Sequence, residues 1–166
     1  PDWAGGTVFV DTRETTIAAD PDRVYRVVTR MGGRNGWYAV DWLWRLRGGL
    51  DHLLGGPGLR RGRRDPERLA YGDALDFWRV TTVEADRRLV LRAEMRLPGD
   101  ATIEFLIEPS AAPGGSRLVQ TARFRPRGLM GLAYWYAVLP LHAVVFQRML
   151  AGIRDAAESQ HEFPRV

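Results

Sequence analysis

Residues 89–125 decide the fold, with the sequence LVLRAEMRLPGDATIEFLIEPSAAPGGSRLVQTARFR. Apolar and polar residues alternate in three segments of this stretch, and Pro98-Gly99-Asp100 and Ala112-Pro113-Gly114-Gly115 separate the segments. Alternation with a period of two predicts strands with one dry and one wet face, and short turns between them predict an antiparallel meander. The expected dry face carries Leu89, Leu91, Ala93, Met95, Leu97, Ile103, Phe105, Ile107, Leu118, Gln120, Ala122 and Phe124.

The wet face of this meander is expected to be charged. It carries Arg92, Glu94, Arg96, Glu104, Arg123 and Arg125. Opposite charges on neighbouring strands favour cross-strand ion pairs over a catalytic group. Functional side chains are therefore expected on the dry face.

A long helix from Gly128 to about Glu158 is expected to cover the dry face. Residues 128–147 carry no formal charge when His142 is neutral, and this length is enough to span a bilayer. Pro140 and His142 lie near the middle of that stretch, however, and a charged helical tail follows it without a break. A helix that is apolar nearly all round is typical of a protein core, so we predict a core helix and no membrane contact.

The residues before the meander predict two strands and two helices. A strand is expected over 7–17 from its β-branched residues, and Asp20-Pro21 then begins a helix. An apolar stripe runs along this helix through Val24, Val27, Val28 and Met31, until Gly32-Gly33 ends it. Residues 36–54 predict a second helix weakened by Gly48-Gly49, and residues 73–83 predict a strand.

The composition indicates one globular domain over residues 1–166, with 45% hydrophobic and 27% charged residues. Because the chain has no cysteine, disulfides, thiolate nucleophiles and iron–sulfur clusters are excluded. All 24 basic residues are arginine, so covalent catalysis by lysine is excluded as well. The net charge of +4 favours solubility and does not by itself indicate nucleic acid. No apolar leader segment opens the chain, and we expect a cytoplasmic protein.

The familiar catalytic and cofactor motifs do not match the sequence. His52, His142 and His161 lack the spacing of metal ligands, and the GxSxG motif of serine hydrolases is absent. The glycines of residues 55–62 have the wrong spacing for a dinucleotide-binding loop and follow a predicted helix instead of a strand. We therefore predict no metal ion and no cofactor in this domain.

One cluster of arginines stands out, made of Arg60, Arg61, Arg63, Arg64 and Arg68. Guanidinium groups bind phosphates and carboxylates through paired hydrogen bonds, so the cluster is a candidate anion site or docking surface. The alternative is a solvated connector whose arginines pair with nearby acids such as Asp65 and Glu67. No nucleic-acid-binding motif accompanies the cluster, and we predict no nucleic-acid partner.

The expected order is strand, helix, helix, antiparallel meander and long helix, which is the helix-grip arrangement of START-like and Bet v 1-like domains. Segments from about Gly6 to Ala157 resemble the DUF2867 family of the START/SRPBCC (polyketide cyclase-like) superfamily. They are residues 36–38 (GWY), 42–48 (WLWRLRG), 58–66 (GLRRGRRDP), 72–80 (GDALDFWRV), 123–129 (RFRPRGL) and 134–136 (YWY). The resemblance implies an α+β helix-grip fold with a curved antiparallel sheet around a long C-terminal helix.

The resemblance also implies a molecular context. Domains of this family often follow an NAD(P)-binding Rossmann domain of the NmrA or epimerase type in the same polypeptide. The chain opens at Pro1 without an initiator methionine, and we expect a fragment of a longer bacterial protein with such an N-terminal domain. No catalytic residue carries over from the family, so the resemblance implies a fold and a neighbour but no reaction.

Helix-grip sheets curve away from their long helix, and the space between suits a small hydrophobic ligand held by a few polar groups. The candidate pocket residues are Trp37, Asp76, Trp78, Gln120, Tyr136 and His142. The strand over 73–83 has two orientations, with either Leu75, Phe77 and Arg79 or Asp76, Trp78 and Val80 facing inward. We favour Asp76 and Trp78 inward, because Arg79 then joins the charged outer face.

Three functions follow from these expectations. The first is an accessory module that binds a small hydrophobic ligand, associated with an NAD(P)-dependent oxidoreductase domain. The second is a cyclase, dehydratase or isomerase in which a buried Asp76 works with His142 or Tyr136 in acid–base catalysis. The third is a structural domain that docks on the Rossmann neighbour through the Arg60–Arg68 segment.

Overall fold

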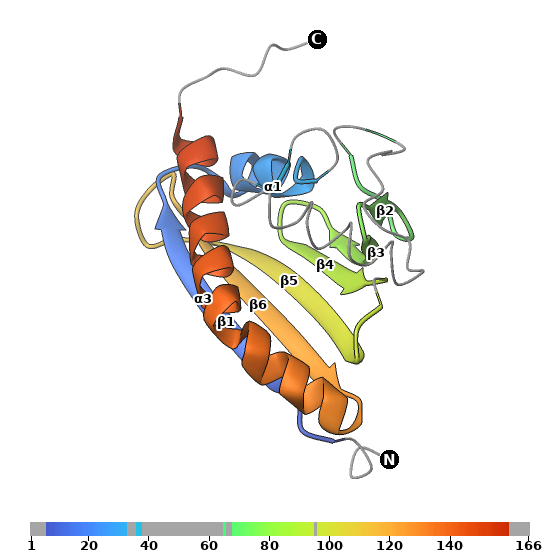
Figure 1. Cartoon of the computed structure of the whole chain (residues 1–166). Coiled ribbons are helices and arrows are strands. Elements are labelled where there is room, and N and C mark those ends of the chain that lie inside the picture. Colours follow the sequence, from blue (N-terminus) through green and yellow to red (C-terminus); the bar gives the residue numbers. More distant parts are fainter. Residues whose placement is uncertain (1–5, 33–35, 38–64, 66–67, 95, 160–166) are drawn as a thin grey trace.

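The computed structural model describes residues 6–32, 36–37, 65, 68–94 and 96–159. The elements in chain order are β1 (Phe9–Ile17), α1 (Pro21–Thr29), β2 (Ala74–Leu75), β3 (Trp78–Glu84), β4 (Arg88–Ala93), β5 (Gly99–Pro109), β6 (Ser116–Pro126) and α3 (Gly128–Glu158). The strands form one six-stranded antiparallel sheet in the order β1-β6-β5-β4-β3-β2. The sheet is curved, and α3 runs along β1 and β6 while α1 lies at one end of the sheet (Figure 1). The predicted meander is confirmed as β4, β5 and β6, although β4 ends at Ala93, before Leu97 of the predicted segment.

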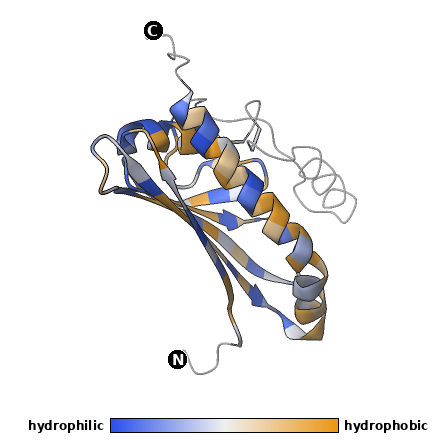
Figure 2. Cartoon of the chain, turned by 90° about the vertical axis from the view of Figure 1, so that its left-hand side faces the viewer, coloured by the Kyte–Doolittle hydropathy of each residue, from blue (hydrophilic) through white to orange (hydrophobic). Residues whose placement is uncertain are grey.

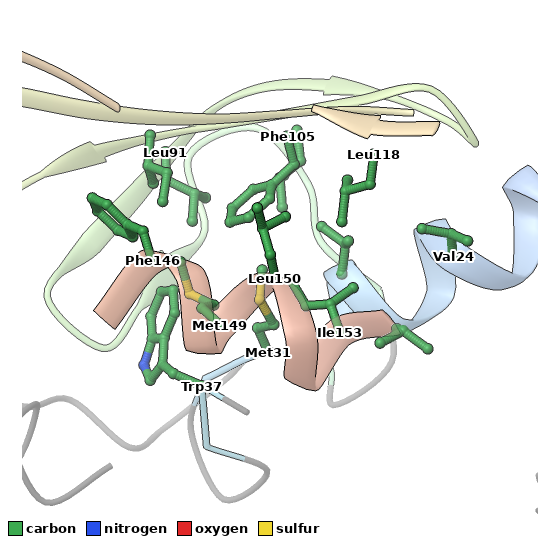
Figure 3. Close-up of a cluster of buried hydrophobic side chains, with 14 of the residues drawn as sticks. Val24, Met31, Trp37, Leu91, Phe105, Leu118, Phe146, Met149, Leu150 and Ile153 are labelled. Carbon is green, nitrogen blue, oxygen red and sulfur yellow. The ribbon is translucent and has the colours of Figure 1, made fainter. Parts of the chain in front are cut away.

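The protein core lies between the inner face of the sheet and the two helices (Figure 3). The stripe predicted for α1 is confirmed, since Val24, Val27 and Val28 are fully buried. The sheet contributes the alternating residues of its inner face, and α3 contributes the residues of its second half. The main members are Leu89, Leu91, Ile103, Phe105, Ile107 and Leu118 from the sheet, and Val145, Phe146, Met149, Leu150 and Ile153 from α3.

The two halves of α3 have different surroundings. Residues 145–157 supply six of its buried side chains, whereas Gly131 and Trp135 are the buried residues of its first half. The first half exposes Leu129, Met130, Tyr136, Leu139, Leu141 and Val144. In Figure 2 the first half is orange or pale, and blue residues appear along the second half. By length and composition alone α3 is apolar enough to cross a membrane. The helix predicted over 128–158 is the core helix of the fold, and its second half supplies most of the buried side chains.

The outer face of the sheet is a network of ion pairs, as predicted. Glu104 on β5 accepts hydrogen bonds from Arg88 on β4 and Arg123 on β6, each at 2.6 Å. Arg79 donates to both oxygens of Glu94, at 2.8 and 3.0 Å. These pairs cross from strand to strand, so they tie the strands together and leave the inner face for other groups.

The single strand predicted over 73–83 is wrong. A turn at Asp76 and Phe77 divides this stretch into β2 and β3, which pair through Leu75 and Trp78. Asp76 has a φ of +56°, a conformation that aspartate tolerates better than most residues. Asp76, Trp78 and Val80 are buried and Arg79 pairs with Glu94 on the outer face, as the favoured orientation predicts. Because the chain reverses here, Leu75 and Phe77 are buried as well.

Candidate ligand site

Gln120 lies in the middle of the inner face of the sheet. It pairs with Arg13 on β1 and Phe105 on β5, and its neighbours on the same face of β6 are Leu118 and Ala122. The side chain is 1% exposed, and neither its Oε1 nor its Nε2 has a hydrogen-bond partner among the described residues. The prediction that Gln120 faces inward is confirmed. A buried amide without partners costs on the order of 1–3 kcal/mol for each unsatisfied group, and both atoms of this amide remain available for hydrogen bonds.

An ion pair lies beside Gln120 on the edge strand. Asp11 and Arg13 occupy the inner face of β1, opposite Ala122 and Gln120. Arg13 Nε is 3.1 and 3.2 Å from the two carboxylate oxygens of Asp11. Arg13 Nη1 also donates to the backbone carbonyl of Ala143 on α3, at 3.0 Å. The positive charge of Arg13 is therefore balanced by Asp11, and the pair fixes the middle of α3 to the edge strand.

His142 completes this polar cluster from the helix side. Its Nδ1 lies 3.7 Å from Asp11 Oδ2, which is too long for a hydrogen bond. The ring packs edge-on against Phe146, with ring centroids 3.9 Å apart, and against Trp135, with centroids 5.4 Å apart. Burial lowers the pKa of His142 to about 4, although the neighbouring Asp11 acts in the opposite direction. The imidazole is therefore uncharged at neutral pH.

Three alanines lie, together with Ile103 and Leu91, on the part of the inner face between Gln120 and a second unpartnered group. Ala122, Ala101 and Ala93 lie on the inner face of β6, β5 and β4, and Ala93 pairs with Trp78 on β3. Trp78 is buried, and its Nε1 has no hydrogen-bond partner among the described residues. Alanines fill less of the space under α3 than the leucines and phenylalanines of the neighbouring positions. This end of the inner face thus combines short side chains with unused hydrogen-bonding atoms.

Asp76 belongs to a different cluster. Its Oδ2 accepts a hydrogen bond of 2.8 Å from Trp37 Nε1, and the carboxylate is 2% exposed. The indole of Trp37 stacks on Phe77 and also approaches Trp78, with centroids 6.3 Å apart in both cases. Trp37, Asp76 and Trp78 therefore lie together, as three of the predicted pocket residues. Asp76 and His142 contact different neighbours, so the structure gives no support to a catalytic pair made of these two.

Tyr136 is not a pocket residue. Its side chain is 63% exposed on α3 and packs edge-on against Phe9, with ring centroids 5.9 Å apart. The prediction was wrong because the side of the first half of α3 that lies toward the sheet is the one that carries Gly131 and Trp135. A tyrosine one position beyond Trp135 points about 100° away from it.

Sequence reasoning missed Asp11 and Arg13. The signal was present, because Phe9 and Ile17 are spaced in period two with Asp11 and Arg13 between them. Residues of one strand separated by two share a face, so two charged residues were placed on the face that Phe9 and Ile17 bury.

The anion-binding candidates Arg60, Arg61, Arg63 and Arg64 lie outside the described residues, as does the helix predicted over 36–54 apart from Gly36 and Trp37. Within that part of the chain that the structure describes, no group of three or more His, Asp or Glu side chains is placed to hold a metal ion. The polar cluster of Asp11, Arg13, Gln120 and His142 is therefore the candidate site that the chemistry of the inner face defines.

A curved antiparallel sheet held against a long C-terminal helix defines the helix-grip class of α+β domains. The chain belongs to the family described as "Protein of unknown function (DUF2867)", whose family model matches residues 3–149. A search of curated proteins found no significant match.

Solved structures share this fold at low sequence identity. A truncated norcoclaurine synthase from Thalictrum flavum has a TM-score of 0.58 and 12% identity, over 96% of this chain and 98% of that chain. A point mutant of the same enzyme in complex with a transition state analogue has a TM-score of 0.54 and 12% identity, over 91% and 94% of the two chains. Ara h 8.0201 has a TM-score of 0.51 and 12% identity, over 91% and 99%. At these identities the likeness concerns the fold alone.

Proposed function

We propose that this protein is a ligand-binding module that holds a small, mainly apolar molecule between the inner face of its sheet and α3. The observation that carries the proposal is the buried amide of Gln120, whose oxygen and nitrogen both lack partners. A folded protein satisfies nearly all buried polar groups, so a side chain left unsatisfied on the concave face of a helix-grip sheet indicates a bound molecule.

Two further observations support the proposal. Ala122 lies next to Gln120 on the inner face of β6, and Ala101 and Ala93 keep the side chains short toward the Trp78 end of that face. The chain also shares its fold with an enzyme whose structure holds a transition state analogue, which shows that a fold of this shape accommodates a small molecule in that protein. No observation favours the acid–base alternative, because Tyr136 is exposed and Asp76 is bound by Trp37.

The test uses the neutral apolar fluorophore N-phenyl-1-naphthylamine and the full chain. We expect saturable binding at one site per chain in the wild type. The Ala101→Phe variant, which adds a ring to the inner face, is expected to weaken binding at least tenfold. The matched control is Ala133→Phe, which adds the same ring on the exposed side of α3.

A second control addresses the exposed apolar surface of α3, which also attracts such probes. Leu141→Gln makes that surface more polar and is expected to leave saturable binding unchanged. Ala93→Leu serves as a milder inner-face variant if Ala101→Phe does not fold. Unsaturable binding in the wild type, or binding that Leu141→Gln abolishes and both inner-face variants retain, would contradict the proposal.

The association with an NAD(P)-dependent oxidoreductase domain stays a prediction, as does docking through Arg60–Arg68. Both rest on the family resemblance and the sequence. They are tested by asking whether charge reversal at Arg60, Arg61, Arg63 and Arg64 changes binding of this domain to a Rossmann domain encoded beside it.

A further inference from the structure

We propose that the ligand carries an uncharged group that both donates and accepts hydrogen bonds, of the carboxamide or lactam class, and that Gln120 recognises it through a pair of hydrogen bonds. This inference rests on the proposed ligand-binding function. It adds the chemical class of the group that the site takes.

The first step concerns what Gln120 offers. A glutamine amide presents one carbonyl oxygen as an acceptor and one NH₂ group as a donor, side by side in one plane. Both atoms are buried and neither is used by the described residues. A ligand that supplies only an acceptor, such as a ketone, leaves the glutamine oxygen unpaired. A planar amide edge supplies a donor and an acceptor with the same spacing and satisfies both atoms.

The second step concerns charge. The charged residues that face the site from the described strands are Asp11 and Arg13, and they form an ion pair with each other. The titratable residue of α3 that lies at the site is His142, and it is neutral because burial lowers its pKa to about 4. The described inner-face residues of β3, β4, β5 and β6 carry no charge. The cluster therefore has no net charge.

The third step follows from that balance. A ligand carboxylate would lose its hydration under α3 and lie near the carboxylate of Asp11, while the guanidinium of Arg13 is already engaged by Asp11 and the Ala143 carbonyl. A ligand ammonium would lie near Arg13. Burying an unpaired charge costs far more than burying a neutral hydrogen-bonding group. The site therefore favours an uncharged polar group.

The test compares three probes on one ring system: 2-naphthamide, methyl 2-naphthyl ketone and 2-naphthoate. Each probe displaces N-phenyl-1-naphthylamine from the full chain, and the side-chain NH₂ signals are followed by NMR in ¹⁵N-labelled protein. The chain has three glutamines and one asparagine, so the Gln120 signal is assigned from its loss in a variant. We expect 2-naphthamide to bind at least tenfold more tightly than the ketone, to shift the Gln120 NH₂ signal, and to bind far more tightly than 2-naphthoate.

The variant Gln120→Met replaces the amide by an apolar side chain of similar volume. We expect it to abolish the preference for 2-naphthamide, because 2-naphthamide then loses two hydrogen bonds and the ketone loses one. Gln147→Met is the matched control, since Gln147 is an exposed glutamine of α3, and we expect it to keep the preference.

The outcomes separate the two proposals. If the fluorophore binds saturably but 2-naphthamide and the ketone bind equally, a water molecule satisfies Gln120 and this inference is overturned while the ligand-binding function stands. Tightest binding of 2-naphthoate overturns it as well, as does a lack of displacement by all three probes. If the fluorophore itself does not bind at one site, the ligand-binding function fails.

Discussion

Replacing Gln120 with methionine is expected to make the ligand-free protein more stable. In most proteins the loss of a buried polar side chain is destabilising, because its partners remain behind unsatisfied. Gln120 has no such partners among the described residues, so the substitution removes a desolvation cost and breaks no hydrogen bond.

The expected gain is worked from the two unsatisfied groups of the amide. Each costs on the order of 1–3 kcal/mol when buried without a partner. Against this, a change of shape at similar volume in a packed interior costs up to about 1.5 kcal/mol. The two groups together cost about 2–6 kcal/mol, so the free energy of unfolding should rise by about 0.5–6 kcal/mol. For a domain of this size each kcal/mol raises the melting temperature by about 2–4 °C.

The assay is urea unfolding followed by tryptophan fluorescence, with protein refolded from denaturant so that no ligand remains. Gln147→Met, on the exposed side of α3, should change the free energy of unfolding by less than about 0.5 kcal/mol. A Gln120→Met protein that is less stable than the wild type under these conditions would refute the reasoning, since it would show that the amide is hydrogen-bonded in the free protein.

Three further predictions concern the rest of the structure. His142 has a pKa of about 4 in the folded protein against 6.5 in the unfolded chain, so its contribution to the free energy of unfolding is fully present above pH 6.5 and is lost as pH falls toward 4. The difference in pKa corresponds to on the order of 3 kcal/mol. His142→Phe should remove this part of the pH dependence of unfolding between pH 6.5 and 4.5. Burial alone would raise the pKa of Glu104, but hydrogen bonds from Arg123 and Arg88 hold it below its usual value. Glu104→Gln should thus lower the free energy of unfolding by about 1–3 kcal/mol at pH 7, and by less below pH 4. The control Glu108→Gln, at a more exposed carboxylate, should lower it by less than about 1 kcal/mol. Equal effects of the two variants in urea unfolding would contradict the burial argument. Asp76→Asn keeps a hydrogen-bond acceptor for Trp37, and asparagine tolerates the positive φ. In thermal unfolding this variant should therefore be more stable than Asp76→Ala by about 1–3 kcal/mol. Two variants of equal stability would show that the hydrogen bond and the turn contribute little.

The sheet could be predicted from sequence because each strand of the meander has one buried face. Leu89, Ile103 and Leu118 alternate with charged or polar residues, and this pattern leaves a single register that keeps them all dry. The hairpin between β2 and β3 gave no such signal. Its turn consists of Asp76 and Phe77 and contains no glycine, so the stretch reads as one continuous strand.

The candidate site was predicted in part, for a physical reason. Gln120 was recognisable because it is a polar residue between Leu118 and Ala122 on the inner face of β6. Asp11 and Arg13 were missed although period two places them on the face of Phe9 and Ile17, because a complementary pair resembles two ordinary surface charges in sequence. Their burial under α3 depends on which strand pairs with β6, and that pairing joins residues about 110 positions apart. Long-range pairing of this kind is decided by the whole fold.

The attachments of α3 have a kinetic consequence. The helix is fixed at its start, where Arg127 N donates to the Pro98 carbonyl and Gly131 lies against Pro98 and Pro126, and at its end, where Glu158 accepts a hydrogen bond from Ala18 N. Arg13 fixes Ala143 between these points. Just before Ala143, Pro140 has no N–H to donate to the Tyr136 carbonyl, so the helix is weakest there. We therefore expect any displacement of α3 from the sheet to bend the helix at Pro140, and the ligand that we propose would exchange more slowly the more firmly these attachments hold.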